Sequence, residues 1–245
     1  MPSPVSAEVI ASSGFEWVCI DQQHGLLGPE QSVSMLQAIG GMGVPAVVRV
    51  RANDPADITK ALDAGAQGVI VPMVNSDVDA RAAVIACRYP PIGVRSWGPI
   101  RANRVVPNYD VEWANTNLIC AVMIETEEAV ANLDRILTVP GVDAVYVGPA
   151  DLALSMGRDP NKAATDSIVE SAIGHVLDAC RRHRVVPGLS CPTIDFAVHW
   201  VGRGYLMVCI KNDLGLLREV AVQWLTSIRS AIAEPSQSVA SGGPV

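Results

Sequence analysis

The chain has 245 residues, a length that suits one (β/α)₈ barrel and also leaves room for two smaller domains. Its formal net charge of −7 argues against nucleic-acid binding, which needs clustered Lys and Arg, and no apolar run reaches the roughly 18 residues of a membrane span. Hydrophobic residues make up 49% of the chain and aromatic residues only 4%. The core is therefore expected to be aliphatic, as in parallel sheets covered by helices.

Cysteine usage and the N-terminus indicate the compartment. The six cysteines show no Cys-x-x-Cys spacing, and Cys19, Cys120 and Cys209 lie inside apolar runs, where a free thiol behaves as a small hydrophobe. The N-terminus lacks the basic and then apolar pattern of a signal peptide. We therefore expect a reducing, cytoplasmic setting.

Strand-like and helical segments alternate along the chain. The seven predicted strands begin near Trp17, Ala46, Gly68, Leu118, Ala144, Val185 and Leu206. Helices are predicted at 6–13, 28–39, 53–64, 77–87, 109–115, 166–182, 194–201 and 214–233, with another that ends at 137. This order predicts a parallel α/β barrel over 1–233, followed by a disordered tail at 234–245 that is rich in Ser, Gly and Pro.

A barrel of this class needs eight strands, and the chain supplies seven. Because it begins inside the first predicted helix, the first strand is expected to be absent, which leaves a gap beside the strand at Trp17. The irregular segment 88–108, rich in Pro, Gly and Arg, is long enough to suggest a functional or interface role.

Polar side chains gather where the predicted strands end, and in barrels this is where catalytic groups lie. They are Asp21, His24, Arg49, Glu125, Asp151, Ser190 and Lys211. Glu125 and Asp151 follow successive strands, and neighbouring strands lie only about 5 Å apart. The two carboxylates are therefore expected to share one cation, and hard oxygen ligands suit Mg²⁺ or Mn²⁺.

Several of these residues also have a structural interpretation. Arg49 suits a buried ion pair with Asp21, and His24 suits a hydrogen bond to a loop carbonyl. Glu125 and Asp151 both stand where an acid caps a helix or favours its dipole.

Several motifs together resemble a known family. They are the segments 15–24, 47–49, 71–74, 88–95, 124–126 and 148–152, which include Asp21-Gln22-Gln23-His24 and Gly148-Pro149-Ala150-Asp151-Leu152. They are similar, in order and spacing, to the HpcH/HpaI aldolase/citrate lyase family over about 6–217. The likeness is greatest to its metal-dependent class II pyruvate aldolases, such as hydroxy-oxo-heptanedioate aldolase and 2-dehydro-3-deoxy-galactarate aldolase.

The resemblance implies a TIM barrel of the phosphoenolpyruvate/pyruvate-binding type and retro-aldol cleavage of a 4-hydroxy-2-oxo acid to pyruvate and an aldehyde. It implies that Glu125 and Asp151 hold a divalent Mg, Mn or Co ion, with Gly148 and the Ala150 N–H at the substrate carboxylate. His24 is then the base and Arg49 the group that stabilises the enolate oxygen. Asp63 is expected to orient His24 from an adjacent subunit of a homo-oligomer, commonly a hexamer built as a trimer of dimers.

Two departures from the family pattern concern the site: Gln23 removes a charge near the water network, and Met123 cannot donate a hydrogen bond to the substrate. Many members carry Glu where Gln23 stands, and the best-known aldolases carry a substrate-binding Gln where Met123 stands. Together with the missing first strand, these changes leave open a barrel that has lost activity and serves as a binding or assembly protein.

Two other enzyme readings stay open. Lys211 ends a predicted strand, so a class I aldolase with a Schiff base there is one alternative. The other is a citrate-lyase-like acyl-CoA lyase, whose coenzyme phosphates would need arginines such as Arg88, Arg95, Arg101 and Arg104.

Overall fold

The computed structural model of the protein describes residues 1–233. It divides the chain into two compact units, Met1–Ile210 and a second unit that starts at Lys211. The predicted tail at 234–245 lies outside the described residues, and a single domain over 1–233 stays a prediction. The two units are described separately below.

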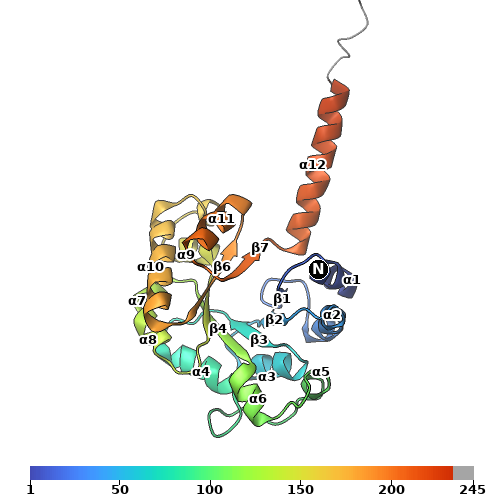
Figure 1. Ribbon diagram of the computed structural model, residues 1–245. Helices are drawn as coiled ribbons and strands as arrows, with labels where there is room; N and C mark the ends of the chain where they lie inside the picture. Colours follow the sequence, from blue (N-terminus) through green and yellow to red (C-terminus); the bar gives the residue numbers. More distant parts are fainter. Residues whose placement is uncertain (234–245) are drawn as a thin grey trace, which may run out of the picture. The chain divides into compact units, whose positions relative to one another are not determined.

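The first unit is a parallel α/β barrel of seven strands that is nearly closed (Figure 1). The strands are β1 (Val18–Asp21), β2 (Ala46–Arg49), β3 (Gly68–Val71), β4 (Ile119–Ile124), β5 (Ala144–Val147), β6 (Val186–Cys191) and β7 (Met207–Ile210). Each strand pairs in parallel with the next one along the chain. All seven predicted strands are thus confirmed.

The barrel has a gap where the sequence predicts it. Within residues 1–233 the sheet order runs from β1 to β7, and β7 does not pair with β1. The segment before β1 is helix α1 (Pro4–Ala11), which packs against α2 (Pro29–Gly41). An eighth strand is therefore missing from the described chain beside β1, as the alternation of elements indicated.

Helices cover the outside of this sheet (Figure 1). After α1 and α2 they are α3 (Pro55–Asp63), α4 (Asp77–Cys87), α5 (Ala102–Val105), α6 (Val111–Asn117), α7 (Glu127–Ala131), α8 (Leu133–Leu137), α9 (Pro149–Ser155), α10 (Ser167–His183) and α11 (Ile194–Arg203), with a 3₁₀ turn at Pro160–Lys162. The segment 88–108, predicted as irregular, contains the short helix α5. Its four residues are too few to give a helical period.

Local capping explains where the helices begin. Asp54 precedes Pro55, and its carboxylate accepts the Ala56 N–H at 2.7 Å at the start of α3. Thr126 does the same for α7 by accepting the Ala129 N–H at 3.0 Å. Each cap stands directly after a strand or a short loop, so the helices start at the carboxyl end of the sheet.

The interior of the barrel is filled by a small cluster of buried side chains, separate from the larger layer between sheet and helices. Its members are Val47, Ile70, Ala121, Met123, Ala144 and Tyr146. Successive side chains of a strand point to opposite faces, so these residues identify the inward-facing positions of β2 to β5. This alternation sets the direction of the polar residues that follow each strand.

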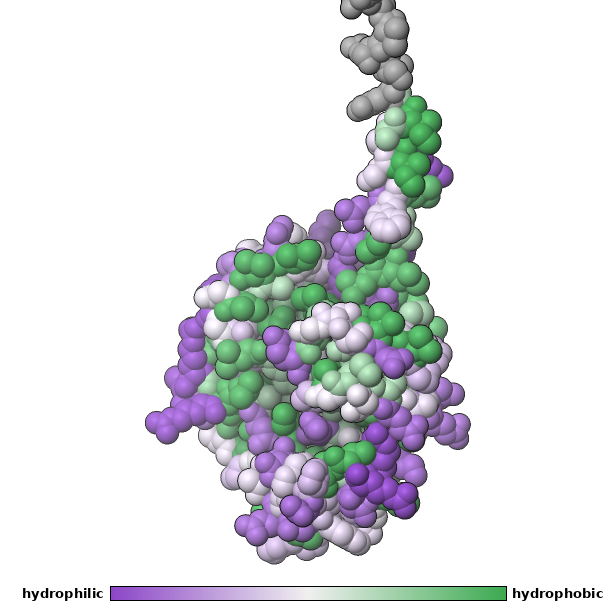
Figure 2. Space-filling model, turned by 45° about the vertical axis from the view of Figure 1, so that its right-hand side comes forward, coloured by the Kyte–Doolittle hydropathy of each residue, from purple (hydrophilic) through white to green (hydrophobic). Residues whose placement is uncertain are grey.

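The second unit contains one helix, α12 (Asp213–Ala233), preceded by Lys211. The Lys211 ammonium forms an ion pair with Glu219 on this helix. Apolar side chains such as Leu217, Trp224 and Ile228 are exposed along it. Figure 2 shows hydrophobic surface on this helix. Of the helices within residues 1–233, none combines the length and apolarity needed to cross a bilayer.

Candidate functional site

Strand alternation brings the predicted polar residues to the inner rim of the barrel. Val47 and Met123 belong to the interior cluster, and Arg49 and Glu125 each stand two positions further along the same strand or just beyond it. Two positions further means the same face. The basic and the acidic group therefore both point into the carboxyl end of the barrel.

Arg49 forms a two-pronged ion pair with Asp21 across β1 and β2. The Arg49 Nε donates to Asp21 Oδ1 at 2.8 Å and Nη2 to Oδ2 at 2.5 Å, because the strand register places the two residues directly opposite. Burial opposes ionisation of Asp21, but the guanidinium outweighs it and holds the Asp21 pKa below its ordinary value. The structural interpretation of Arg49 is thus observed, and the pair still lies on the rim.

Glu125 is almost fully buried, with 1% of its surface exposed. The Met73 backbone N–H donates to its Oε1 at 2.7 Å, and its Oε2 is buried with no hydrogen-bond partner in the described chain. Burial raises the Glu125 pKa above its ordinary value, and the nearby Asp151 carboxylate raises it further. Two acids that follow consecutive strands therefore lie close to each other.

The residue that holds Glu125 lies on the loop after β3. Met73 adopts a left-handed backbone conformation with φ of 55°, which is uncommon for a residue with a side chain. Its N–H is thereby directed at the carboxylate. Sequence reasoning did not find this contact, because a backbone donor leaves no mark in the residue types.

Gly148 lies against the free oxygen of Glu125. It stands two positions after the inward-facing Tyr146, and a Cβ added to it would lie 3.1 Å from Glu125 Oε2 and 3.2 Å from Met123 Cε. Both contacts are tight for a methyl group. The glycine therefore keeps space open beside the unpartnered oxygen, at the start of α9.

Asp151 and Ala150 occupy the first turn of α9. The first bond within this helix runs from the Leu152 N–H to the Gly148 carbonyl at 2.9 Å, so the N–H groups of Ala150 and Asp151 precede it and have no partner in the helix. The capping interpretation of Glu125 is wrong, because Thr126 caps α7. Asp151 lies in the first turn but does not cap α9, whose cap position is Gly148.

The donor set suits a hard divalent cation. A buried carboxylate oxygen with no partner, a second carboxylate beside it and an open glycine wall are what a cation with oxygen ligands requires. Residues 1–233 contain no group of three or more His, Cys, Asp or Glu side chains placed so that together they could hold a metal ion. Two carboxylates without further protein ligands fit Mg²⁺, which retains several waters.

His24 lies on the loop that follows β1 and is exposed. Its backbone N–H donates to Asp21 Oδ1 at 3.3 Å, so the same carboxylate that holds Arg49 also anchors this loop. Within the described chain the imidazole has no hydrogen bond or ion pair. It is therefore available at the rim, near the Asp21 and Arg49 pair.

Asp63 is at the other end of the barrel. It is the last residue of α3, after which the chain returns to the beginning of β3. There the Gln67 N–H donates to the carbonyl of Ala46, the first residue of β2, so Asp63 lies near the amino ends of the strands. Asp63 pairs with the buried Arg95, whose Nη2 lies 2.7 Å from Oδ1. The structure thus does not bring Asp63 to His24 of the same chain.

Three arginines of the segment 88–108 bind groups of their own chain. Arg88 donates to the Leu118 carbonyl and to Asp143, both at 2.7 Å. Arg95 pairs with Asp63, and Arg101 donates to the backbone. These interactions fasten the segment to the barrel, and they leave Arg104 as the arginine of this set with no partner among residues 1–233.

Comparisons with known proteins find relatives over most of the chain. The family model of HpcH/HpaI aldolase/citrate lyase matches residues 2–219. A hydroxypyruvate/pyruvate aldolase of Rhizorhabdus wittichii is 37% identical over 230 residues, 94% of this chain and 92% of that protein. A 4-hydroxy-2-oxo-heptane-1,7-dioate aldolase of Klebsiella pneumoniae subsp. pneumoniae is 40% identical over 219 residues, 88% of this chain and 82% of that protein.

A solved structure confirms the fold. The crystal structure of an HpcH/HpaI aldolase/citrate lyase family protein from Burkholderia cenocepacia superposes with a TM-score of 0.86 at 31% identity. The match covers 94% of this chain and 91% of that one. The architecture read from the strand order is therefore shared with a known protein over nearly its whole length.

Proposed function

Because the chain belongs to the HpcH/HpaI aldolase/citrate lyase family, we propose that it is a divalent-metal-dependent pyruvate aldolase. It cleaves a 4-hydroxy-2-oxo acid to pyruvate and an aldehyde, and it catalyses the reverse addition. One observation carries the proposal: the buried, unpartnered Oε2 of Glu125 beside a second carboxylate. A free thiol at each of the six cysteines suits a reducing cytoplasm as its location.

Glu125 and Asp151 would hold the Mg, Mn or Co ion. When bound, such a cation supplies Lewis acidity to the carbonyl oxygen of a 2-oxo acid. Glu125 is fixed by the Met73 N–H and by burial, so its free oxygen keeps one direction. This rigidity favours binding because no side-chain rearrangement is needed.

In this proposal His24 transfers the proton and Arg49 stabilises the negative charge. The His24 imidazole takes the proton of the C4 hydroxyl, the C3–C4 bond breaks and the aldehyde leaves. The bonding electrons move to the 2-oxo group, where the Arg49 guanidinium stabilises the negative charge that develops. The protonated His24 then returns this proton, directly or through a water molecule, to C3 of the enolate, which gives pyruvate and restores the neutral imidazole. Asp21 keeps Arg49 extended toward the rim through its two hydrogen bonds.

The start of α9 binds the substrate carboxylate in this proposal. The Ala150 N–H has no partner within the helix and lies next to Asp151 in sequence, so it is suited to donate to an anionic group. Gly148 leaves the room that such a group requires. The 2-oxo acid is thus oriented with its carboxylate at α9 and its carbonyl toward Arg49.

Asp63 acts on the His24 of an adjacent subunit, in a homo-oligomer that is a trimer of dimers. The support for this is its position at the end of α3, away from the rim of its own barrel, together with an exposed and unpaired His24. Arg95 holds the Asp63 carboxylate in place. The catalytic unit is then completed only between chains.

The test measures the pyruvate released from a 4-hydroxy-2-oxo acid, which a coupling enzyme reduces while NADH is oxidised. Protein treated with EDTA should be inactive, and added Mn²⁺ or Mg²⁺ should restore activity. Borohydride with pyruvate should trap no adduct on Lys211. Activity that survives complete chelation, or a trapped adduct, would contradict the proposal. If several 4-hydroxy-2-oxo acids are not cleaved and pyruvate adds to none of several aldehydes, a barrel that has lost activity is favoured.

A further inference from the structure

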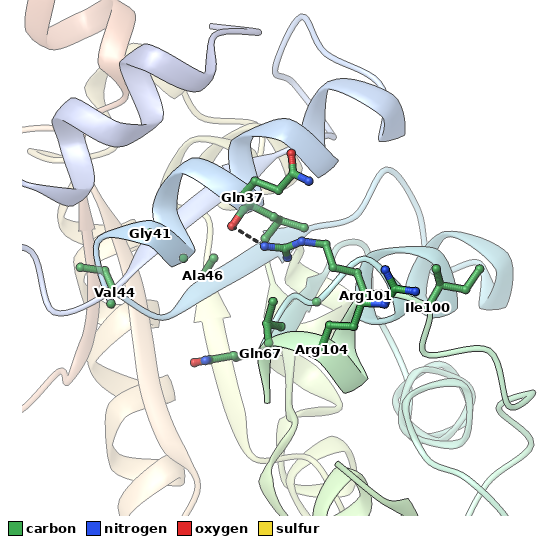
Figure 3. A pocket seen from close by; sticks show the side chains of 13 residues that line it. Gln37, Gly41, Val44, Ala46, Gln67, Ile100, Arg101 and Arg104 are labelled. Atoms are coloured by element: carbon green, nitrogen blue, oxygen red, sulfur yellow. Dashed lines mark hydrogen bonds between the residues drawn. The ribbon is translucent and has the colours of Figure 1, made fainter. Parts of the chain in front are cut away.

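A second concave site lies far from the reaction chemistry. A pocket of about 770 Å³ is formed by the end of α2, the start of β2, the turn after α3 and helix α5 (Figure 3). Its wall includes Ala46, the first residue of β2, and Gln67, which directly precedes β3. The pocket is therefore at the amino ends of the strands, whereas Arg49 and Glu125 are at the carboxyl ends.

The pocket contains two arginines and no acid. Arg101 and Arg104 both line it, and none of the thirteen residues placed around it is Asp or Glu. In a chain with a formal net charge of −7, two guanidinium groups without a carboxylate form a local excess of positive charge. A concave wall strengthens the attraction of such charges for an anion.

Arg101 is held in place without being neutralised. Its Nη1 donates to the Ala64 carbonyl at 2.8 Å. Its Nη2 donates to the Leu36 carbonyl at 3.1 Å, the bond drawn as a dashed line in Figure 3. In residues 1–233 no carboxylate pairs with it, and burial lowers its pKa. Gly65, with φ of +95°, makes this position possible, because a Cβ there would lie 2.6 Å from Arg101 Nη1.

Arg104 and two amides are free to bind. Arg104 is exposed and forms no hydrogen bond or ion pair with the rest of the described chain, so all five of its N–H donors are available. The side chains of Gln37 and Gln67 also line the pocket without a partner among residues 1–233. Glycines and aliphatic side chains, Val44 and Ile100 among the latter, form the remaining wall.

We propose that this pocket binds a small organic anion, a molecule with one phosphate or carboxylate group on an apolar body. The anionic group binds Arg104 in the field of Arg101, and the body lies on the apolar wall beside α2. Its volume is within the range of small-molecule sites. The site is separate from the catalytic rim and does not depend on the proposed aldolase reaction.

Phenyl phosphate is the probe, because it combines the anion with an apolar ring. Calorimetric titration of the purified protein should show binding that weakens as salt is raised, and the Arg104 variant below separates this site from the catalytic rim. Inorganic phosphate should bind more weakly and phenol not at all. Carboxylate specificity is tested in parallel with benzoate, so the two sources of the anion are distinguished.

Arg104→Ala should weaken phenyl phosphate binding by about tenfold or more, since charge-assisted hydrogen bonds are lost. Arg81→Ala, which removes one exposed arginine on α4, should leave the affinity unchanged. Ile100→Ser should weaken phenyl phosphate but not inorganic phosphate. Both Arg variants should keep wild-type aldolase activity.

Equal affinity for phenyl phosphate in Arg104→Ala and wild type, or no binding of phenyl phosphate to the wild type, would overturn the proposal. A change in the oligomeric state of Arg104→Ala in sedimentation experiments would overturn it as well. In that case the pocket is a contact between subunits.

Discussion

The backbone N–H of Met73 and the carboxylate of Glu125 are 52 residues apart in sequence and joined by a hydrogen bond of 2.7 Å. The bond uses Oε1 and leaves Oε2 buried without a partner. A buried carboxylate oxygen in this state is costly unless a cation or a hydrogen-bond donor binds it. The proposed cation site depends on this relationship.

Glu125→Gln should stabilise the metal-free protein at neutral pH. Burial and Asp151 raise the Glu125 pKa above 4.5 in the folded state. A raised folded pKa gives stability at low pH that is lost as the pH rises through that pKa. Thermal unfolding in EDTA should therefore show the variant more stable than wild type near pH 8 and the difference vanishing at about pH 4.

Glu128→Gln is the matched control for that experiment, because Glu128 is exposed on the neighbouring helix α7. Its unfolding temperature should follow that of wild type at every pH. If the unfolding temperature of Glu125→Gln also follows that of wild type at every pH, the charged Glu125 carboxylate does not destabilise the folded protein.

Gly148→Ala should weaken metal binding with little change in fold. The added Cβ would lie 3.1 Å from Glu125 Oε2 and displace the oxygen. Disturbing the group that orients a ligand costs about 10- to 100-fold in metal affinity. Gly202→Ala is the control, because nothing lies within 4 Å of the added methyl group. Equal Mn²⁺ affinity in the two variants would contradict the crowding argument.

Arg49→Lys should lower kcat by about 100-fold, the scale of losing one donor to a developing oxyanion. Lysine keeps the charge but cannot reproduce the two bonds to Asp21. Arg51→Lys changes the corresponding two-bonded pair with Asp57 at an exposed position and should leave kcat nearly unchanged. A similar loss in both variants would show that Arg49 has no special role in the reaction.

His24→Ala and Asp63→Asn should complement each other. Each protein alone is expected to be inactive, because each lacks one member of a pair that comes from two chains. Mixed oligomers contain sites with an intact His24 from one chain and an intact Asp63 from another, so pyruvate release should return on mixing. Continued inactivity, in mixtures shown by mass spectrometry to have exchanged subunits, would place Asp63 outside the site.

Most of what the sequence predicted correctly about the fold came from the pattern of apolar runs. Apolar runs located all seven strands, and the alternation of side chains explains why Arg49 and Glu125 meet on one rim. The helix predicted at 53–64 is observed as α3, which begins at Pro55 with Asp54 as its cap. Local chemistry was sufficient in these cases.

Other features depend on tertiary contacts that composition does not encode. The Met73 N–H reaches Glu125 only through a left-handed backbone turn. Arg101 was one of four arginines in an irregular segment, and its two carbonyl partners come from α2 and from the turn after α3. Both depend on where distant segments lie in the fold.

The central claim is that Glu125 and Asp151 together hold one divalent cation, and Mn²⁺ titration of the EDTA-treated protein tests it directly. We predict one Mn²⁺ per chain in wild type and in His24→Ala, and no measurable binding in Glu125→Gln or Asp151→Asn. Unchanged Mn²⁺ stoichiometry and affinity in either acid variant would contradict the account.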